Sequence, residues 1–145
     1  MDKSDLIDIL PANLIKKGTY MLADNIVCKV DEYHTAKTGK HGSAKMLIKA
    51  YELVSGKQKD ISISTSDKVE IPIINRKEYL LMGIEDNFMQ LLNDKGELIE
   101  NIKLNNNDVS KKLLESFENK SDEQEVTVSI MHFMNQTLVD DLKMK

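Results

Sequence analysis

The amino-acid sequence predicts a mainly β protein with two small domains and one sizeable helix. Most of its apolar stretches are short and β-branched or alternating, as strands are. Pro72 interrupts this pattern near the middle of the chain, and only one segment has the apolar spacing of a helix. A length of 145 residues suffices for one domain or two small ones. Since the strand pattern breaks at Pro72, we place the domains at residues 1–71 and 72–145.

The first domain is predicted to be a small all-β barrel or sandwich. Its four strand candidates are residues 26–30, 46–54, 61–64 and 69–71. Gly56 lies in a turn after the second candidate, and no long amphipathic helix separates the strands. Proline has no amide hydrogen for a sheet, so we expect the chain to leave the first sheet at Pro72.

The second domain repeats this style and adds a helix. Its strand candidates are residues 79–84, 88–92, 97–104 and 126–130, with a turn at Gly96. Residues 105–108 offer helix N-cap side chains. The next apolar residues share one helical face and predict a helix over about 108–118: Val109, Leu113, Leu114 and Phe117. This order is compatible with an oligonucleotide-binding (OB) barrel, but periodicity does not distinguish it from another five-stranded barrel.

Composition excludes several classes of protein. Hydrophobic residues make up 41% and charged residues 30%, which is typical of a globular chain. No apolar run approaches the ~18 residues of a transmembrane helix, and the N-terminus lacks the features of a signal peptide. The single cysteine, Cys28, excludes an intrachain disulfide and indicates a reducing compartment. We therefore expect a soluble, cytoplasmic protein without a membrane partner.

Charge is distributed unevenly along the chain. The net charge is −4, but residues 1–71 hold eleven lysines against ten acidic residues, whereas residues 72–145 hold nine basic against fourteen acidic residues. Between Tyr33 and Tyr51 there are four lysines, two histidines and no acid. Such a segment in an acidic protein indicates a local contact with an anion, or else a solvated loop with a chance cluster of charge.

The loop predicted at residues 33–45 is the most informative segment. Gly39 and Gly42 flank Lys40 and permit a tight reversal that pushes this lysine outward. A phosphate-binding loop is disfavoured because the first glycine of that motif is missing. Contact of its lysines with folded RNA is the interpretation that the residues favour, because the chain has few aromatic residues for stacking on single-stranded bases.

Enzymatic and metal-binding sites are not predicted. Cys28, His34 and His41 would need a fourth zinc ligand, and Cys28 fits a buried position in a strand. Ser43 and His41 have no nearby acid to orient them as a nucleophilic pair. We interpret His132 as a half-buried strand residue and the eight methionines as core residues.

The loop resembles the hypusine loop of the eukaryotic translation factor 5A family. The matching residues are Lys37-Thr38-Gly39-Lys40-His41-Gly42, followed by Ala44-Lys45. Further matches are Lys17-Gly18, Cys28-Lys29-Val30, residues 55–59, Ile71-Pro72, residues 75–79, residues 82–84 and residues 94–97. The resemblance covers about residues 10–143 in one register and implies an N-terminal SH3-like barrel followed by a C-terminal OB-fold barrel that carries one helix.

The resemblance also implies a covalent modification rather than a cofactor. In this family, deoxyhypusine synthase transfers an aminobutyl group from spermidine to the loop lysine, here Lys40, and a hydroxylase completes hypusine. Many members have histidine where this chain has Ser43, which bears on hydroxylation more than on aminobutyl transfer. The other loop residues expected to contact RNA are Lys37, Thr38, Gly39, His41, Gly42, Ser43 and Lys45.

The implied function is that of a non-enzymatic translation factor. Members of the family bind the ribosomal exit site, where the modified loop meets ribosomal RNA and peptidyl-tRNA and reaches toward the peptidyl-transferase centre. There it relieves stalling, notably at proline runs, with a further role in termination. The alternative is an unmodified, generic RNA-binding protein or RNA chaperone.

Overall fold

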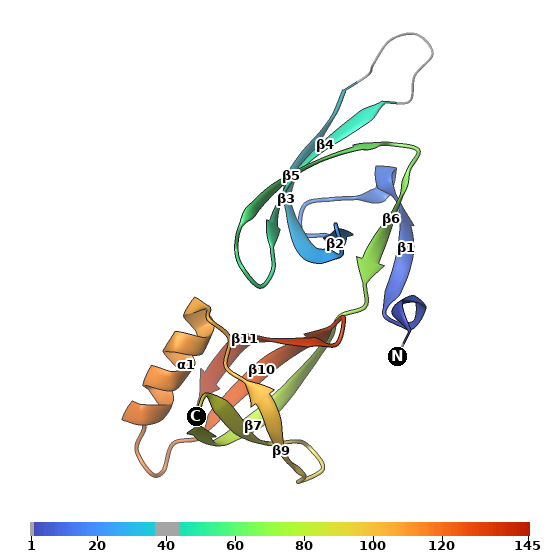
Figure 1. Cartoon of the computed structure of the whole chain (residues 1–145). Coiled ribbons are helices and arrows are strands. Elements are labelled where there is room, and N and C mark those ends of the chain that lie inside the picture. The colour runs from blue at the N-terminus through green and yellow to red at the C-terminus, as the bar shows by residue number, and fades with distance from the viewer. Residues whose placement is uncertain (1, 37–43) are drawn as a thin grey trace. The chain divides into compact units, whose positions relative to one another are not determined.

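The structure, a computed structural model, describes residues 2–36 and 44–145 and divides the chain into two compact units, Met1–Ile73 and Ile74–Lys145 (Figure 1). Strands dominate both units, and the described residues contain one α-helix, which lies in the second unit. The predicted mainly β class is therefore confirmed. No helix in the described part of the chain is long and apolar enough to cross a membrane.

The first unit consists of six antiparallel strands and two short 3-10 helices. Its elements are η1 (Lys3–Asp5), β1 (Ile7–Pro11), η2 (Ala12–Leu14), β2 (Tyr20–Ala23), β3 (Ile26–Ala36), β4 (Lys45–Glu52), β5 (Gln58–Ser64) and β6 (Lys68–Pro72). The order β2-β3-β4-β5 forms one sheet, and β1 pairs with β6 in another. Pro72 is the last residue of β6 and lies opposite Ile7, so the strand ends at the proline as expected.

Alternation along β4 builds the core of this unit. Met46, Ile48 and Ala50 are buried on one face of the strand and pack with residues such as Cys28 and Val30 of β3. Cys28 is fully buried, which confirms its interpretation as a small core residue, and burial raises the pKa of its thiol. The core therefore fixes one end of the β3–β4 hairpin.

Two strand predictions for the first unit need correction. β3 continues six residues beyond the predicted end at Val30, so Tyr33, Thr35 and the rest of residues 33–36 belong to a strand and not to the loop. Lys45 likewise begins β4. Residues 31–36 are all exposed, so they have no apolar alternation, and backbone pairing with β4 extends the strand instead. β1 and β2 are short and were missing from the prediction.

The second unit is a five-stranded antiparallel sheet with one helix. Its elements are β7 (Asn75–Glu85), β8 (Phe88–Leu92), β9 (Leu98–Lys103), α1 (Asp108–Asn119), β10 (Val126–Phe133) and β11 (Gln136–Met144), in the sheet order β11-β10-β7-β8-β9. The prediction lacked β11. Leu113 of α1 is fully buried among Leu91, Ile130 and the other apolar residues of the sheet, which confirms the predicted helical face.

Local backbone chemistry determines where these elements begin and turn. Asn107 caps α1, because its side-chain oxygen accepts a hydrogen bond from the Ser110 amide at 2.9 Å. Two-residue turns join β7 to β8 and β10 to β11, and both residues of each turn have positive φ. In both turns the second of these residues is asparagine, which tolerates this conformation well.

Candidate functional site

The β3–β4 hairpin carries the loop that the sequence singles out. Its register runs from Cys28 opposite Glu52 to Ala36 opposite Lys45. Seven of the predicted site residues lie outside the described residues: Lys37, Thr38, Gly39, Lys40, His41, Gly42 and Ser43. Lys45 is described, is exposed and forms the last pair of the hairpin. The described structure therefore gives the base from which the predicted loop starts and to which it returns.

β3 of this hairpin leaves the core after Val30, whereas β4 stays in it through Met46 and Ile48. On β4, Met46 is buried while its neighbours Lys45 and Leu47 are exposed, and on β3 no residue after Val30 is buried up to Ala36. A register shift between Val30 and Glu32 marks the point where β3 leaves the core. In Figure 1 the ends of β3 and β4 lead to the grey trace, and β5 pairs with β4 as far as Lys45 opposite Ser64. We call residues 31–36 and 45–49 the hairpin arm.

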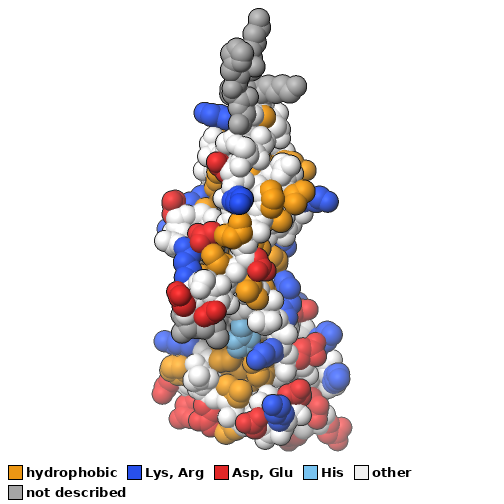
Figure 2. Space-filling view, turned by 90° about the vertical axis from the view of Figure 1, so that its right-hand side faces the viewer, with side chains coloured by type: hydrophobic (Ala, Val, Ile, Leu, Met, Phe, Trp, Pro, Cys, Tyr) orange, Lys and Arg blue, Asp and Glu red, His pale blue; other side chains and the backbone are white. Residues whose placement is uncertain are grey.

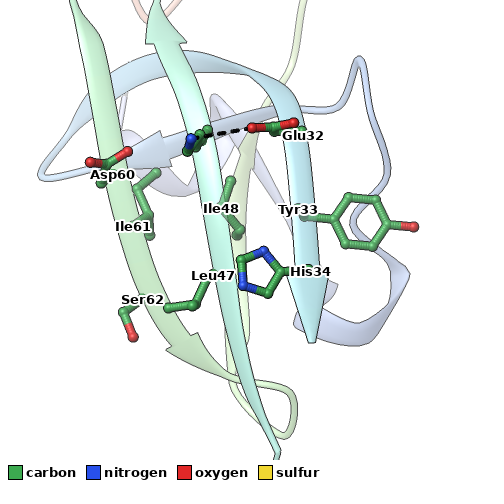
Figure 3. A pocket seen from close by; sticks show the side chains of 9 residues that line it. Glu32, Tyr33, His34, Leu47, Ile48, Asp60, Ile61 and Ser62 are labelled. Atoms are coloured by element: carbon green, nitrogen blue, oxygen red, sulfur yellow. Dashed lines mark ion pairs between the residues drawn. The ribbon is translucent and has the colours of Figure 1, made fainter. Parts of the chain in front are cut away.

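One face of the hairpin arm forms a shallow depression of about 450 Å³ together with β5 (Figure 3). His34 of β3 lies opposite Leu47 of β4, which lies opposite Ser62 of β5. In Figure 3 the His34 ring lies beside Leu47, whereas the Tyr33 ring points away from them. An exposed leucine next to an imidazole offers a small contact surface for a partner that approaches the predicted loop.

Charges on this face are mixed rather than uniformly basic. Lys49 Nζ lies 3.4 Å from Glu32 Oε1, and Asp60 lies opposite Lys49 on the other side. Both partners of the ion pair are largely exposed, so the pair adds little stability. The acid-free run in the sequence is therefore offset by acids on the flanking strands. Lys45, at the end of the hairpin, has no ion-pair partner among the described residues.

A second depression, of about 510 Å³, adds residues that the sequence did not single out as a site. Lys17, Lys29 and Tyr51 line it, and Lys29 Nζ lies 5.6 Å from the centroid of the Tyr20 ring. Lys29 and Tyr51 face each other across β3 and β4. The sequence pattern that could have indicated this surface is the spacing of Lys45, Lys49 and Tyr51 along β4. Because side chains alternate along a strand, this spacing places all three on the exposed face.

Of the residues considered for catalysis or metal binding, His41 and Ser43 lie outside the described residues. Cys28 is buried in the first unit, whereas His132 is half-buried on β10 of the second, as interpreted from the sequence. His132 Nε2 and the Tyr79 hydroxyl lie 3.0 Å apart, and burial, with a contribution from Lys77, lowers the pKa of His132. Within residues 2–36 and 44–145, no three His, Cys, Asp or Glu side chains are placed to hold a metal ion.

Comparison with known proteins gives the same family in both halves of the chain. The family model "Translation initiation factor 5A-like, N-terminal" matches residues 9–67. The model "Eukaryotic elongation factor 5A hypusine, DNA-binding OB fold" matches residues 73–143. Eukaryotic translation initiation factor 5A-1 of Arabidopsis thaliana is 34% identical over 134 residues, which cover 91% of this chain and 83% of that protein. The Saccharomyces cerevisiae protein of the same name is 30% identical over 123 residues, covering 84% and 78%.

Solved structures agree with this match. A translation initiation factor 5A family protein of Naegleria fowleri superposes with a TM-score of 0.84 at 28% identity, covering 95% of this chain and 99% of that one. Translation initiation factor 5A of Methanococcus jannaschii gives a TM-score of 0.74 at 20% identity, covering 94% and 95%, and supports the fold. The predicted SH3-like barrel followed by an OB barrel with one helix is thereby confirmed.

Proposed function

Because this chain belongs to the translation factor 5A family, we propose that it acts at the ribosomal exit site through a modified Lys40. Residues 1–71 would form the domain that presents the loop, and residues 72–145 the OB domain. The loop would meet ribosomal RNA and support the acceptor end of peptidyl-tRNA near the peptidyl-transferase centre. Relief of stalling at proline runs, and a contribution to termination, follow from that position. The factor would work in the cytoplasm.

The observation that carries this proposal is the register of the hairpin arm. Ala36 pairs with Lys45, so the connecting segment leaves β3 and returns to β4 at residues that lie opposite each other. Lys40 lies near the middle of this segment in the sequence. Residues 31–36 before this segment and Lys45 after it are exposed. We propose that Lys40 is presented from this exposed end of the hairpin to a modifying enzyme and later to a narrow RNA cavity.

The chemistry of the modification fits this task. Deoxyhypusine synthase would attach an aminobutyl group from spermidine to Lys40 Nζ, and the hydroxylase would then act on the extended chain. The product is longer than lysine and carries a second amine, so it can contact phosphates that a folded surface cannot approach. The remaining loop residues, with Lys45 at the hairpin end, would add contacts to the RNA backbone.

Mass spectrometry tests the modification directly. The protein is expressed in its native host, and the peptide that contains Lys40 is compared with the same peptide from a host that lacks the synthase. We expect an added aminobutyl mass on Lys40 in the first sample only. An unmodified lysine in both samples would contradict the proposal and would favour the alternative, a generic RNA-binding or RNA-chaperone protein.

A further inference from the structure

The OB domain has an exposed sheet face whose charge is opposite to that of a nucleic-acid site. OB barrels bind oligonucleotides on the face of their second and third strands, which here are β8 and β9. That use requires cations that track the phosphates and aromatic rings that stack on bases. In Figure 2 acidic side chains are numerous over the second unit, in the lower part of the view. Around the exposed face of β8 and β9, the carboxylates of Glu85, Asp86 and Glu100 outnumber the ammonium group of Lys103.

The acidic face is built on both sides of β8 by strand register. Met89 and Leu91 point into the core and are fully buried, so Phe88 and Gln90 point outward. Phe88 lies opposite Glu85 of β7 and opposite Lys103 of β9. A depression of about 260 Å³ lies here, lined by Glu85, Asp86, Phe88, Met89, Gln90 and Glu100. We call this surface, together with Met82 and Leu98, the β8 face.

The β8 face is apolar as well as acidic. Met82, Phe88 and Leu98 have exposed fractions of 53%, 42% and 56%. Large apolar side chains with this exposure on one sheet mark an unpartnered surface rather than a core. Beside Gly83, the flexible end of the Gln90 side chain occupies the space that a Cβ would take. The missing side chain lets the Gln90 carboxamide lie across β7 beside the depression.

The carboxylates of the β8 face are free to receive a cation. Among the described residues, none of Glu85, Asp86 and Glu100 has an ion-pair partner. These three carboxylates are not placed to hold one metal ion together. Their separate positions are better suited to several cationic side chains of a partner than to a single metal ion. Lys103 lies on the same face, with its Nζ 5.7 Å from the centroid of the Phe88 ring, so this ring already contacts an ammonium group of the chain itself. The three carboxylates nevertheless outnumber this one cation.

From these observations we propose that the β8 face binds a basic polypeptide segment rather than nucleic acid. Lysine or arginine side chains of the partner would contact Glu85, Asp86 and Glu100, and its apolar side chains would pack on Met82, Phe88 and Leu98. Phosphates would be repelled by the same three carboxylates. This interaction does not depend on Lys40 or on its modification, so it stands apart from the proposed function of the loop.

The test uses the full chain and two labelled probes, a short peptide of alternating lysine and leucine and a short oligothymidylate. Amide chemical shifts in the isotope-labelled protein report where each probe binds. We expect the peptide to shift the amides of Phe88, Gln90 and Glu100. Reversal of charge in E85K/E100K should weaken its binding by about tenfold, and Phe88→Ala, which changes no charge, should weaken it as well.

The matched control is E115K/E118K, which changes the net charge equally at two exposed positions of α1. This variant should bind the peptide as the wild type does, and the melting temperatures of all variants should be compared. Equal weakening by both double variants would reduce the effect to net charge and overturn the proposal. Oligothymidylate shifting the amides of the β8 face, or the peptide failing to shift them, would overturn it too.

Discussion

The hairpin arm of the first unit and the β8 face of the second are both exposed surfaces of antiparallel sheets, yet they relate differently to a core. Residues 31–36 of the arm are all exposed, whereas Met46 and Ile48, which lie opposite them on β4, belong to the core. On β8, the fully buried Met89 and Leu91 alternate with the exposed Phe88 and the half-buried Gln90. The β3 side of the arm can therefore change in sequence at little cost to folding, whereas the β8 face shares its strand with the core.

This difference shows at which positions a mutation can change function without changing the stability of the fold. At the exposed positions of the arm, such as Tyr33 and Leu47, a substitution that removes activity reports on binding or modification, because no core side chain is removed. On the β8 face, only outward residues can be changed in this way, and each variant needs a stability measurement. The charges differ as well, since Lys45 is free at the end of the arm while the β8 face carries free carboxylates.

The largest expected effect comes from opening a cavity behind the β8 face. Leu91→Ala should lower the free energy of unfolding by about 2–5 kcal/mol, because the side chain is fully buried. Leu47→Ala on the arm should change it by only about 0.5 kcal/mol, since this leucine is 39% exposed. Urea unfolding of both variants measures the contrast. Equal losses would show that Leu47 is packed as tightly as Leu91, against its exposure.

A smaller loss of stability is expected at the start of α1. Asn107→Ala removes two hydrogen bonds of the side-chain carboxamide. Its Oδ1 accepts a hydrogen bond from the Ser110 backbone amide, and its Nδ2 donates one to the Val139 carbonyl at 3.0 Å. We expect a loss of about 1–2 kcal/mol in the free energy of unfolding. Asn107→Asp keeps a capping oxygen and serves as the control. A wild-type unfolding midpoint for Asn107→Ala would rule out this capping role.

Acid should weaken the second unit through His132. Burial lowers the pKa of this imidazole in the folded protein, so the unfolded chain binds the proton more readily. The stability contributed by neutral His132 is complete above its unfolded pKa of about 6.5 and declines as pH falls toward the lower folded pKa. Thermal melts of wild type and His132→Gln between neutral pH and pH ~5 test this. The variant should lose part of the decline, and parallel curves would refute it.

The smallest effects are expected for single lysines at the loop. Lys45→Ala, and Lys37→Ala outside the described residues, should each weaken ribosome binding and lower the logarithmic salt slope by roughly 0.7–0.9. The reason is that each lysine would release one counterion from a phosphate. Binding measured over a range of salt concentrations gives the slope, with Lys111→Ala on α1 as the control. Slopes unchanged in both loop variants would identify these lysines as merely solvated.

The sequence predicted the helix and most of the strands, but not β1, β2, β11 or the exposed end of β3. Alternating apolar residues identified β8 and the start of β10, and the spacing of Leu113 and its neighbours identified α1. Residues 31–36 gave no such signal because they are exposed on both faces and are held by pairing with β4. β1 was missed because its pairing with β6 is long-range. β2 and β11 pair with their neighbours across two-residue turns, but their buried residues are adjacent, Met21-Leu22 and Leu138-Val139, and give no alternating pattern.

The candidate site was predictable to a different degree. Glycines around Lys40 and the local excess of lysine drew attention to the loop, and Lys45 is exposed at its base. The acids that offset this charge, Glu32 and Asp60, come from neighbouring strands and could be placed beside Lys49 only by the register. The β8 face was likewise invisible in the sequence, since it joins residues from three strands.

Peptide-bond formation through a run of prolines on purified ribosomes tests the role of Lys40 most directly. Three proteins are compared, each with its melting temperature: the modified wild type, the unmodified wild type and Lys40→Arg. Arginine keeps the charge but cannot accept the aminobutyl group, because its guanidinium stays protonated and is a poor nucleophile. We predict that only the modified protein is active while all three are equally folded. Activity of the unmodified protein or of Lys40→Arg equal to that of the modified factor would contradict the modified-lysine mechanism.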